Sequence, residues 1–185
     1  MDLTLEQLES LAAECNLCEL YKGQIKPVFA RGNKEADIII CGMCPGPDEN
    51  RAGIPFVGPA GKILDEIINR TFSLKYKYYI TNLVKCFVPV GISLEESWMS
   101  VCLPYFIVQL KLIKPKAVIA LGKDVSNFLL NKDDQMGDLR GHVYDYMGTK
   151  LICSYHPAFL ARNGGLNSKY FNIVFKDFKK ALEFI

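Results

Sequence analysis

Four cysteines have the type and spacing of a metal site. Cys15 and Cys18 form a C-x2-C pair near the N-terminus, and Cys86 and Cys102 lie far along the chain, sixteen positions apart. Four thiolates are the ligand count of a tetrahedral zinc ion or of an iron–sulfur cluster. Spacing alone does not separate the two, but either group would attach the N-terminal segment to the middle of the chain.

Three further cysteines complete a total of seven. Cys41 and Cys44 form a rival C-x2-C pair, and Cys153 stands alone. Cys41 and Cys153 belong to apolar runs, where a thiol usually acts as a small hydrophobe. Because an odd count argues against a closed disulfide framework, we favour the first quartet as ligands.

A second group of residues suited to chemistry follows the apolar runs. It comprises the Gly/Pro-rich loop 42–47, Asn82, Gly122 and His156. A side-chain amide offers a donor and an acceptor, and an imidazole can donate to a developing anion. Each residue also has a structural alternative, because an Asn often turns the chain at the end of a strand and a His often caps a loop.

Apolar patterns predict the elements that position these residues. Strands are expected at 37–42, 78–86, 116–122 and 150–154, and helices at 3–14, 61–72, 93–113 (with Pro104 as a potential interruption), 123–130 and 170–184. Such alternation predicts a single α/β domain spanning 1–185, a three-layer α/β/α arrangement with a central four-stranded parallel sheet. Ligands bind beyond the carboxyl ends of such strands, where the polar residues lie.

Composition limits the remaining possibilities. The chain has 185 residues, half of them hydrophobic, which is enough for one full core. Its apolar runs are too short to span a membrane, and its N-terminus does not resemble a signal peptide. We therefore expect a cytoplasmic monomer without a membrane partner. The net charge of +2 leaves nucleic-acid binding to local patches.

The strand-end motifs resemble the iron–sulfur, or family 4, uracil-DNA glycosylases. The matching motifs are G-M-C-P-G-P-D-E at 42–49, G-I-P-F-V-G-P-A-G at 53–61, T-N-L-V-K-C at 81–86 and H-P-A at 156–158. The resemblance implies the uracil-DNA glycosylase fold and a base excision repair enzyme. Such an enzyme hydrolyses the N-glycosidic bond of uracil in single- or double-stranded DNA and leaves an abasic site.

The resemblance also implies roles for three side chains around a base that has been turned out of the DNA. Phe56 would stack on uracil, although a lone Phe is more often a core aromatic. Asn82 would donate to O4 and accept from N3–H, a pattern that cytosine reverses. His156 would donate to O2 as negative charge grows there. On this basis Asn82 and His156 are the expected catalytic residues.

The loop after the first strand completes the implied substrate site. Gly42 opens it, and the backbone N–H groups of Met43 and Cys44 would donate to uracil O2. Glu49 matches a family glutamate that crowds the C5 edge of the base and disfavours thymine; the alternative is a solvated loop acid. Met43 and Cys44 depart from the family pattern, which has Glu and then a small residue, and this puts rate and base preference in question.

For the cysteines, the resemblance selects a structural [4Fe–4S] cluster held by the first quartet. It also implies that the loop after the histidine enters the minor groove. Phe159, Leu160 and Arg162 would be wedge residues that fill the gap left by the base; alternatively, Phe159 and Leu160 start a helix and pack inward. Lys62, Lys85 and Lys123 are candidates for phosphate contacts.

Two other functions remain open at this stage. Met43 and Cys44 would suit a glycosylase-like protein that binds DNA without cleaving it. A glycosylase for another damaged base, such as hypoxanthine, would use the same scaffold.

Overall fold

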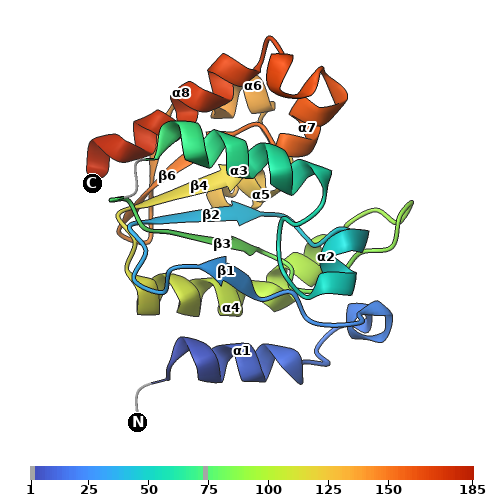
Figure 1. The fold of residues 1–185 in the computed structure, drawn as a ribbon. Helices are drawn as coiled ribbons and strands as arrows, with labels where there is room; N and C mark the ends of the chain where they lie inside the picture. The colour runs from blue at the N-terminus through green and yellow to red at the C-terminus, as the bar shows by residue number, and fades with distance from the viewer. Residues whose placement is uncertain (1–2, 73–74) are drawn as a thin grey trace.

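The computed structural model describes residues 3–72 and 75–185, and within these ranges a mixed six-stranded sheet runs through the molecule (Figure 1). Its strands are β1 (Ala30–Gly32), β2 (Ile38–Gly42), β3 (Tyr78–Asn82), β4 (Ala117–Leu121), β5 (Val143–Tyr146) and β6 (Thr149–Ser154). Their order is β1-β3-β2-β4-β6-β5. The inner four strands are parallel, whereas β1 and β5 pair antiparallel at the two edges.

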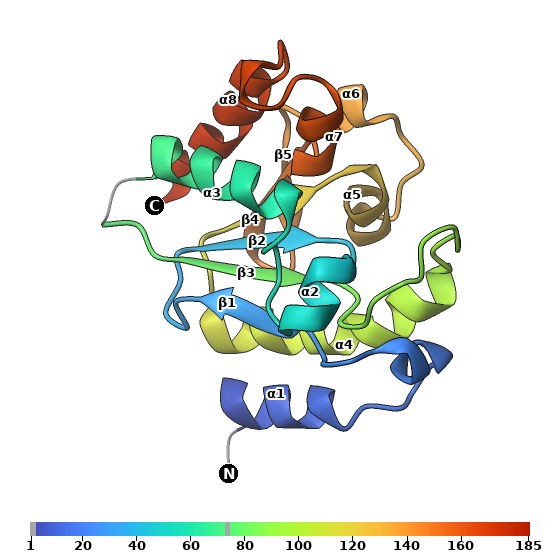
Figure 2. The ribbon, with the colours of Figure 1, turned by 45° about the vertical axis from the view of Figure 1, so that its right-hand side comes forward.

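Helices cover both faces of the sheet (Figure 2). They are α1 (Leu5–Ala13), α2 (Pro47–Ala52), α3 (Pro59–Thr71), α4 (Glu96–Ile113), α5 (Lys123–Leu130), α6 (Met136–Leu139), α7 (Pro157–Arg162) and α8 (Phe171–Ala181), with 3-10 turns at Glu19–Gly23, Gly165–Asn167 and Leu182–Phe184. Helices α3, α7 and α8 pack on one face, α4 and α5 pack on the other, and α1 lies outside α4. The predicted three-layer α/β/α class is confirmed.

The sheet is buried on both faces, which explains its apolar strands. Side chains alternate along β2, so that Ile38 and Ile40 face α3 and α8 while Ile39 and Cys41 face α4. All four side chains are fully buried. Among the described residues, the helices do not combine the length and apolar character needed to cross a membrane.

Local chemistry sets the helix ends. The first helix begins after Thr4, whose hydroxyl accepts from the Gln7 N–H while the Gln7 side chain accepts from the Thr4 N–H. Helix α3 begins with Pro59, at a position that needs no N–H donor. Pro104 lies inside α4, which continues on both sides of it, so the potential interruption does not occur.

The sheet differs from the predicted four parallel strands at its edges and at one strand end. Strands β1 and β5 are additional; β1 has three residues, Ala-Arg-Gly, too few for an alternating pattern to reveal. The strand expected at 78–86 ends at Asn82. The next two residues leave the sheet, although the N–H groups of Leu83 and Val84 still donate to the carbonyls of Gly42 and Met43.

The parallel strands point toward α2 and toward the segment that joins β3 to α4, on the right in Figure 1. The loops that follow β2, β3, β4 and β6 therefore meet at one edge of the sheet. The predicted substrate-binding residues lie at these strand ends or on these loops.

Candidate active site

A pocket of about 340 Å³ opens at the carboxyl ends of β2, β3 and β6. This volume suits a small molecule. Five of the predicted site residues line it, namely Cys44, Glu49, Phe56, Asn82 and His156. Met43 instead packs against the core on the α4 side of the sheet.

Asn82 brings a buried amide to the pocket wall. Its side-chain oxygen is fully enclosed and has no hydrogen-bond partner among the described residues. Gly42 makes room for it, because a Cβ at that position would lie 2.4 Å from Asn82 Oδ1 and 2.6 Å from Phe56 Cζ. An unsatisfied buried acceptor costs about 1–3 kcal/mol. The fold thus retains, next to the pocket, an acceptor that a bound N–H would satisfy.

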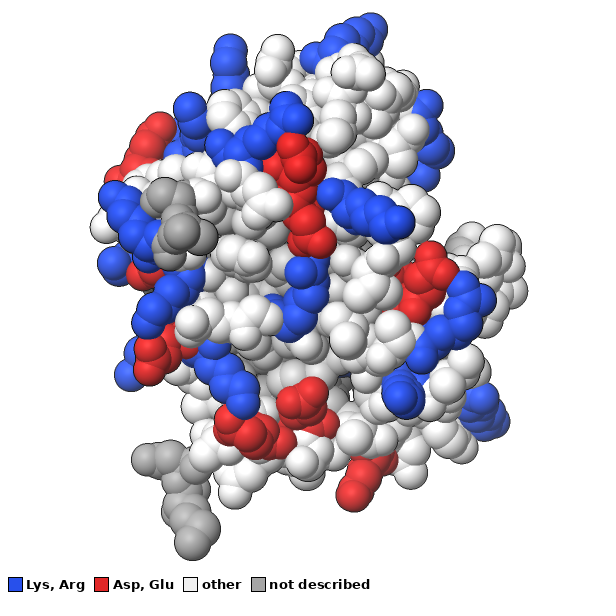
Figure 3. Space-filling view, in the orientation of Figure 1, with Lys and Arg blue, Asp and Glu red and all other residues white. Residues whose placement is uncertain are grey.

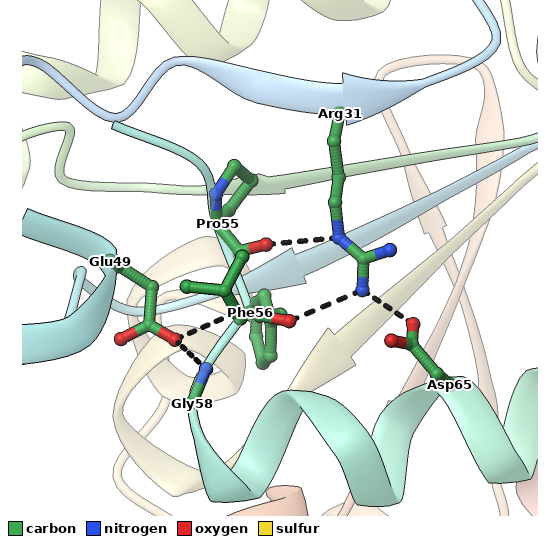
Figure 4. Close-up of polar contacts among 7 residues, drawn as sticks. Arg31, Glu49, Pro55, Phe56, Gly58 and Asp65 are labelled. Carbon is green, nitrogen blue, oxygen red and sulfur yellow. Dashed lines mark hydrogen bonds and ion pairs between the residues drawn. The ribbon is translucent and has the colours of Figure 1, made fainter. Parts of the chain in front are cut away.

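Phe56 enters the pocket from a strained loop. Its φ of 56° lies in the left-handed region, which is rare for a bulky residue. Arg31 of β1 holds the loop, since Nε donates to the Pro55 carbonyl at 2.9 Å and Nη2 to the Phe56 carbonyl at 3.4 Å (Figure 4). The same Nη2 lies 2.5 Å from the Asp65 carboxylate of α3. Gly61 permits this approach, because a Cβ there would lie 1.9 Å from the Phe56 carbonyl oxygen.

Glu49 holds the loop from the other side. One carboxylate oxygen accepts from the N–H groups of Val57 at 2.9 Å and Gly58 at 2.8 Å (Figure 4). The other oxygen accepts from the Gly46 N–H at 3.0 Å. Gly46 and Gly58 precede α2 and α3, where N–H groups lack partners within the helix and anions are favoured. The alternative of a solvated loop acid is therefore wrong, while a contact with the base stays a prediction.

His156 also lines the pocket and stacks beside Phe56, with ring centroids 5.7 Å apart and planes inclined by 29°. Its Nδ1 accepts from the Ala158 N–H at 3.1 Å, so the neutral ring carries its proton on Nε2. Burial lowers the pKa of His156 to about 4, with a further contribution from the positive charge of Arg162. The imidazole is therefore neutral near pH 7 and can act as a donor through Nε2.

The second C-x2-C pair is divided between two environments. Cys41 lies within the core, where burial raises the pKa of its thiol to about 12. Cys44 lines the pocket, and burial, aided by the carboxylates of Asp124 and Glu49, raises its pKa to about 11. Both remain thiols at neutral pH. Neither of them lines the cavity that is lined by Cys15, Cys18, Cys86 and Cys102.

The first quartet lines a different cavity, between α1, α4 and the segment after β3. Burial raises the pKa of the Cys18, Cys86 and Cys102 thiols, and a bound metal centre would hold them as thiolates instead. Within residues 3–72 and 75–185, these side chains are not grouped tightly enough to hold a single metal ion. Four thiol donors around one cavity nevertheless fit a larger cysteine-ligated group.

Sequence reasoning missed the roles of two basic residues. Arg31 lies on the edge strand β1, which was not predicted. Its position in the sequence does not indicate that it binds the carbonyls of Pro55 and Phe56. Lys85 was a candidate for phosphate contact, but it is 2% exposed and cannot reach a phosphate. Its place within the motif T-N-L-V-K-C, inside an apolar run, was the available indication of burial.

The three predicted wedge residues all lie on α7, in different environments. Leu160 is fully buried in the core, so it cannot insert into DNA, and the inward-packing alternative holds for this residue. Phe159 stacks on Tyr155 with centroids 4.8 Å apart and meets Tyr170 edge-on. Arg162 is exposed. At the pocket itself, Val90 lines the mouth and is 86% exposed.

Comparison with known proteins shows the family. A family model of the uracil DNA glycosylase superfamily matches residues 29–179. The type-4 uracil-DNA glycosylase of Saccharolobus solfataricus is 34% identical in an alignment 191 residues long, gaps included, which covers 97% of this chain and 87% of that protein. The enzyme of the same name from Thermotoga maritima is 31% identical over 188 residues, covering 98% of this chain and 97% of its own. The chain belongs to the type-4 uracil-DNA glycosylases.

The family expected from the motifs is thus confirmed. A type-5 uracil-DNA glycosylase of Pyrobaculum aerophilum matches less of the chain, at 27% identity over 76% of it. The superfamily match begins after Cys15 and Cys18. By contrast, a match to 97% or 98% of the chain must include these two cysteines. The N-terminal segment that carries these two cysteines therefore lies within the region that aligns with the type-4 relatives.

Proposed function

We propose that the pocket at the carboxyl edge of the sheet is where this type-4 glycosylase hydrolyses the N-glycosidic bond of uracil in DNA. The observation that carries the assignment is the unpartnered carbonyl oxygen of Asn82, buried beside the pocket that Phe56 and His156 also line. A uracil ring placed there stacks on Phe56. Its N3–H satisfies the orphaned oxygen, and its O4 accepts from the amide NH₂ of Asn82.

The same amide rejects cytosine. Cytosine presents an acceptor at N3 and a donor at its exocyclic amine, so a fixed Asn82 amide meets acceptor with acceptor and donor with donor. A site that is built to hydrogen-bond one pattern discriminates strongly against the reverse pattern.

Bond cleavage leaves negative charge on uracil O2 and positive charge on the sugar. His156 donates from Nε2 toward O2, and its low pKa keeps it a neutral donor across the physiological range. The nearby carboxylate of Glu49 is already bound to three N–H groups, so it holds the loop rather than activating water. Stabilisation of the departing uracil anion therefore provides most of the catalysis.

The four cysteines of the first quartet are the proposed ligands of a [4Fe–4S] cluster. A lone zinc ion, with Zn–S bonds of about 2.3 Å, would draw the four sulfurs closer than their present arrangement. A cluster of several irons held by these four thiolates would join the N-terminal segment to α4 as a structural cross-link.

DNA contact is proposed for the rim of the pocket, through exposed Arg162 and through Phe159 of α7. On the face drawn in Figure 3, basic side chains are interspersed with acidic ones rather than gathered in one field. Local contacts, rather than a broad positive surface, would thus position the DNA. We expect the enzyme to act as a monomer on single- or double-stranded DNA.

The test is incubation of purified protein with oligonucleotides containing uracil, thymine or hypoxanthine, followed by alkali. Breaks confined to uracil are expected, and Asn82→Ala and His156→Ala should each lower them strongly. Retention of the uracil oligonucleotide without breaks would favour a binding protein, and breaks at hypoxanthine alone would favour another base. Full activity in both variants would remove these residues from the site.

A further inference from the structure

Lys85 is a buried cation with neutral partners. Its ammonium donates to Thr81 Oγ1 at 2.7 Å, to the Asn82 backbone carbonyl at 2.6 Å and to Gln109 Oε1 at 2.9 Å. It also lies 5.5 Å from the centre of the Phe29 ring. Among the described residues, the carboxylates lie beyond ion-pair distance of this ammonium.

An ammonium buried without a counter-charge is costly, even when its hydrogen bonds are made. The folded protein would be more stable with an apolar residue at this position, or with a carboxylate beside the ammonium. The presence of an unpaired charge therefore indicates that negative charge arrives from a group that the polypeptide does not itself supply.

The four-cysteine cavity is where that charge would lie. Lys85 lines this cavity together with Cys86 and Cys102. Lys85 directly precedes Cys86 in sequence, so the two residues share one wall of this cavity. Four thiolates with a [4Fe–4S] core carry net negative charge.

We propose that Lys85 is the internal counter-cation of the cluster and that its bond to the Asn82 carbonyl couples the cluster to the uracil-reading residue. This inference rests on the proposed assignment of the four cysteines as cluster ligands. It makes Lys85 a positioning residue, since its ammonium hydrogen-bonds the backbone of Asn82 and does not line the substrate pocket.

The electrostatic consequence has a definite sign. A nearby cation stabilises the more negative, reduced state of a cluster and raises the midpoint potential of its one-electron couple. Removing the cation lowers that potential, so the cluster is oxidised and lost more readily.

The experiment compares Lys85→Met, Gln109→Glu and the control Lys111→Met, which removes a charge from an exposed position of the helix that carries Cys102. Gln109→Glu keeps the lysine but places a carboxylate against its ammonium, which cancels the charge by another route. The readouts are iron per chain, the midpoint potential in a dye-mediated titration followed by visible absorbance, and the rate of bleaching by ferricyanide.

Lys85→Met and Gln109→Glu should both shift the midpoint to a more negative value and speed bleaching, while Lys111→Met matches the parent. Loss of discrimination between uracil and cytosine should occur in Lys85→Met, because Asn82 loses its backbone anchor, and should not occur in Gln109→Glu. If Lys85→Met fails to fold, Gln109→Glu still decides the matter.

Unchanged potential and bleaching in Gln109→Glu, with full iron content, would overturn the proposal. So would a parent protein that binds zinc or no metal. A parent that holds the cluster and shows the potential shifts, but does not excise uracil, would instead refute the proposed reaction while leaving the counter-cation in place.

Discussion

Asn82 has two carbonyl oxygens, and only one of them has a hydrogen-bond partner among the described residues. The backbone oxygen accepts from the buried Lys85 ammonium at 2.6 Å, whereas the side-chain oxygen lacks a partner in the described part of the chain. The first arrangement fixes where the residue lies. The second leaves its side chain available for recognition, at a cost in stability that a functional role explains.

Asn82→Ala should therefore separate activity from stability. We expect kcat/KM for uracil excision to fall by about 10²- to 10³-fold, as is usual when a hydrogen bond to the reacting group is removed. The free energy of unfolding should stay equal or rise, by up to about 1 kcal/mol, because an unsatisfied buried acceptor is deleted. Excision kinetics and urea denaturation would measure the two effects, and a marked loss of stability would show that the amide is a structural group.

His156 should make the stability of the protein depend on pH. The unfolded imidazole binds a proton near pH 6.5, and the folded one does so only near pH 4. Its contribution is therefore present above pH 6.5 and is lost as the pH falls toward 4, amounting to about 3 kcal/mol at most. His156→Gln should lose less stability than the parent between pH 7 and pH 4.5 in urea denaturation. Parallel losses in the two proteins would contradict the buried neutral imidazole.

The residues that could be predicted from sequence were those within motifs. Phe56, Asn82 and His156 sit at strand ends or beside Gly/Pro-rich loops, and the pocket contains all three. Arg31 and Lys85 could not be assigned in this way. The role of each depends on partners far away in sequence, Asp65 for one and Gln109 for the other, which only the tertiary packing brings near.

At the scale of elements, the pocket is assembled from two helix N-termini joined by one carboxylate. Glu49 links the N–H groups ahead of α2 and α3, and Arg31 links β1 to the same loop. The strained backbone of Phe56 is thus held from both sides (Figure 4). Strain of this kind persists where surrounding contacts over-determine it.

Glu49→Ala should loosen this assembly. Three N–H groups lose their acceptor, so we expect about 2–3 kcal/mol less stability and a raised KM for uracil-containing DNA. Asp48→Ala is the matched control, since Asp48 is the neighbouring acid and pairs at the surface with Arg51. Thermal denaturation and excision kinetics of the two variants would decide, and equal effects would argue against the special role of Glu49.

The helices and the inner strands could be predicted because their buried faces require apolar residues at regular intervals, and this pattern is visible in the sequence. The helix expected at 123–130 matches α5, and the strand expected at 37–42 matches β2 within one residue. The edge strands escaped prediction because they are short and half-exposed, so partner strands rather than periodicity define them. The end of β3 escaped because Leu83 and Val84 remain buried after the chain leaves the sheet.

At the scale of the whole molecule, helix α1 lies on the outside of α4. Leu8 and Ala12 of α1 form a small apolar cluster with Phe29, and Tyr105 and Val108 of α4 pack against it. The four-cysteine cavity lies beside this contact. A cluster bound there would add a covalent attachment to these apolar contacts.

Cys15→Ser should therefore release the N-terminal segment. We expect loss of iron, a lower Tm, and rapid cleavage before residue 29 in limited proteolysis, since a freed terminal segment is a preferred cleavage site. Cys153→Ala is the control, because Cys153 is a fully buried thiol outside the cavity. It should keep its iron and its N-terminal segment, and proteolysis followed by mass spectrometry would compare the two.

The antiparallel strands at the borders of the sheet have a consequence for the behaviour of concentrated solutions. An open border exposes N–H and C=O groups to which another molecule can add a strand. Strand β1 is limited to three residues and ends at Gly32 with φ 111°, and β5 carries Asp145 paired with Lys150. Short length, a bend and charge all discourage such growth, so molecules that meet edge to edge should separate rather than aggregate.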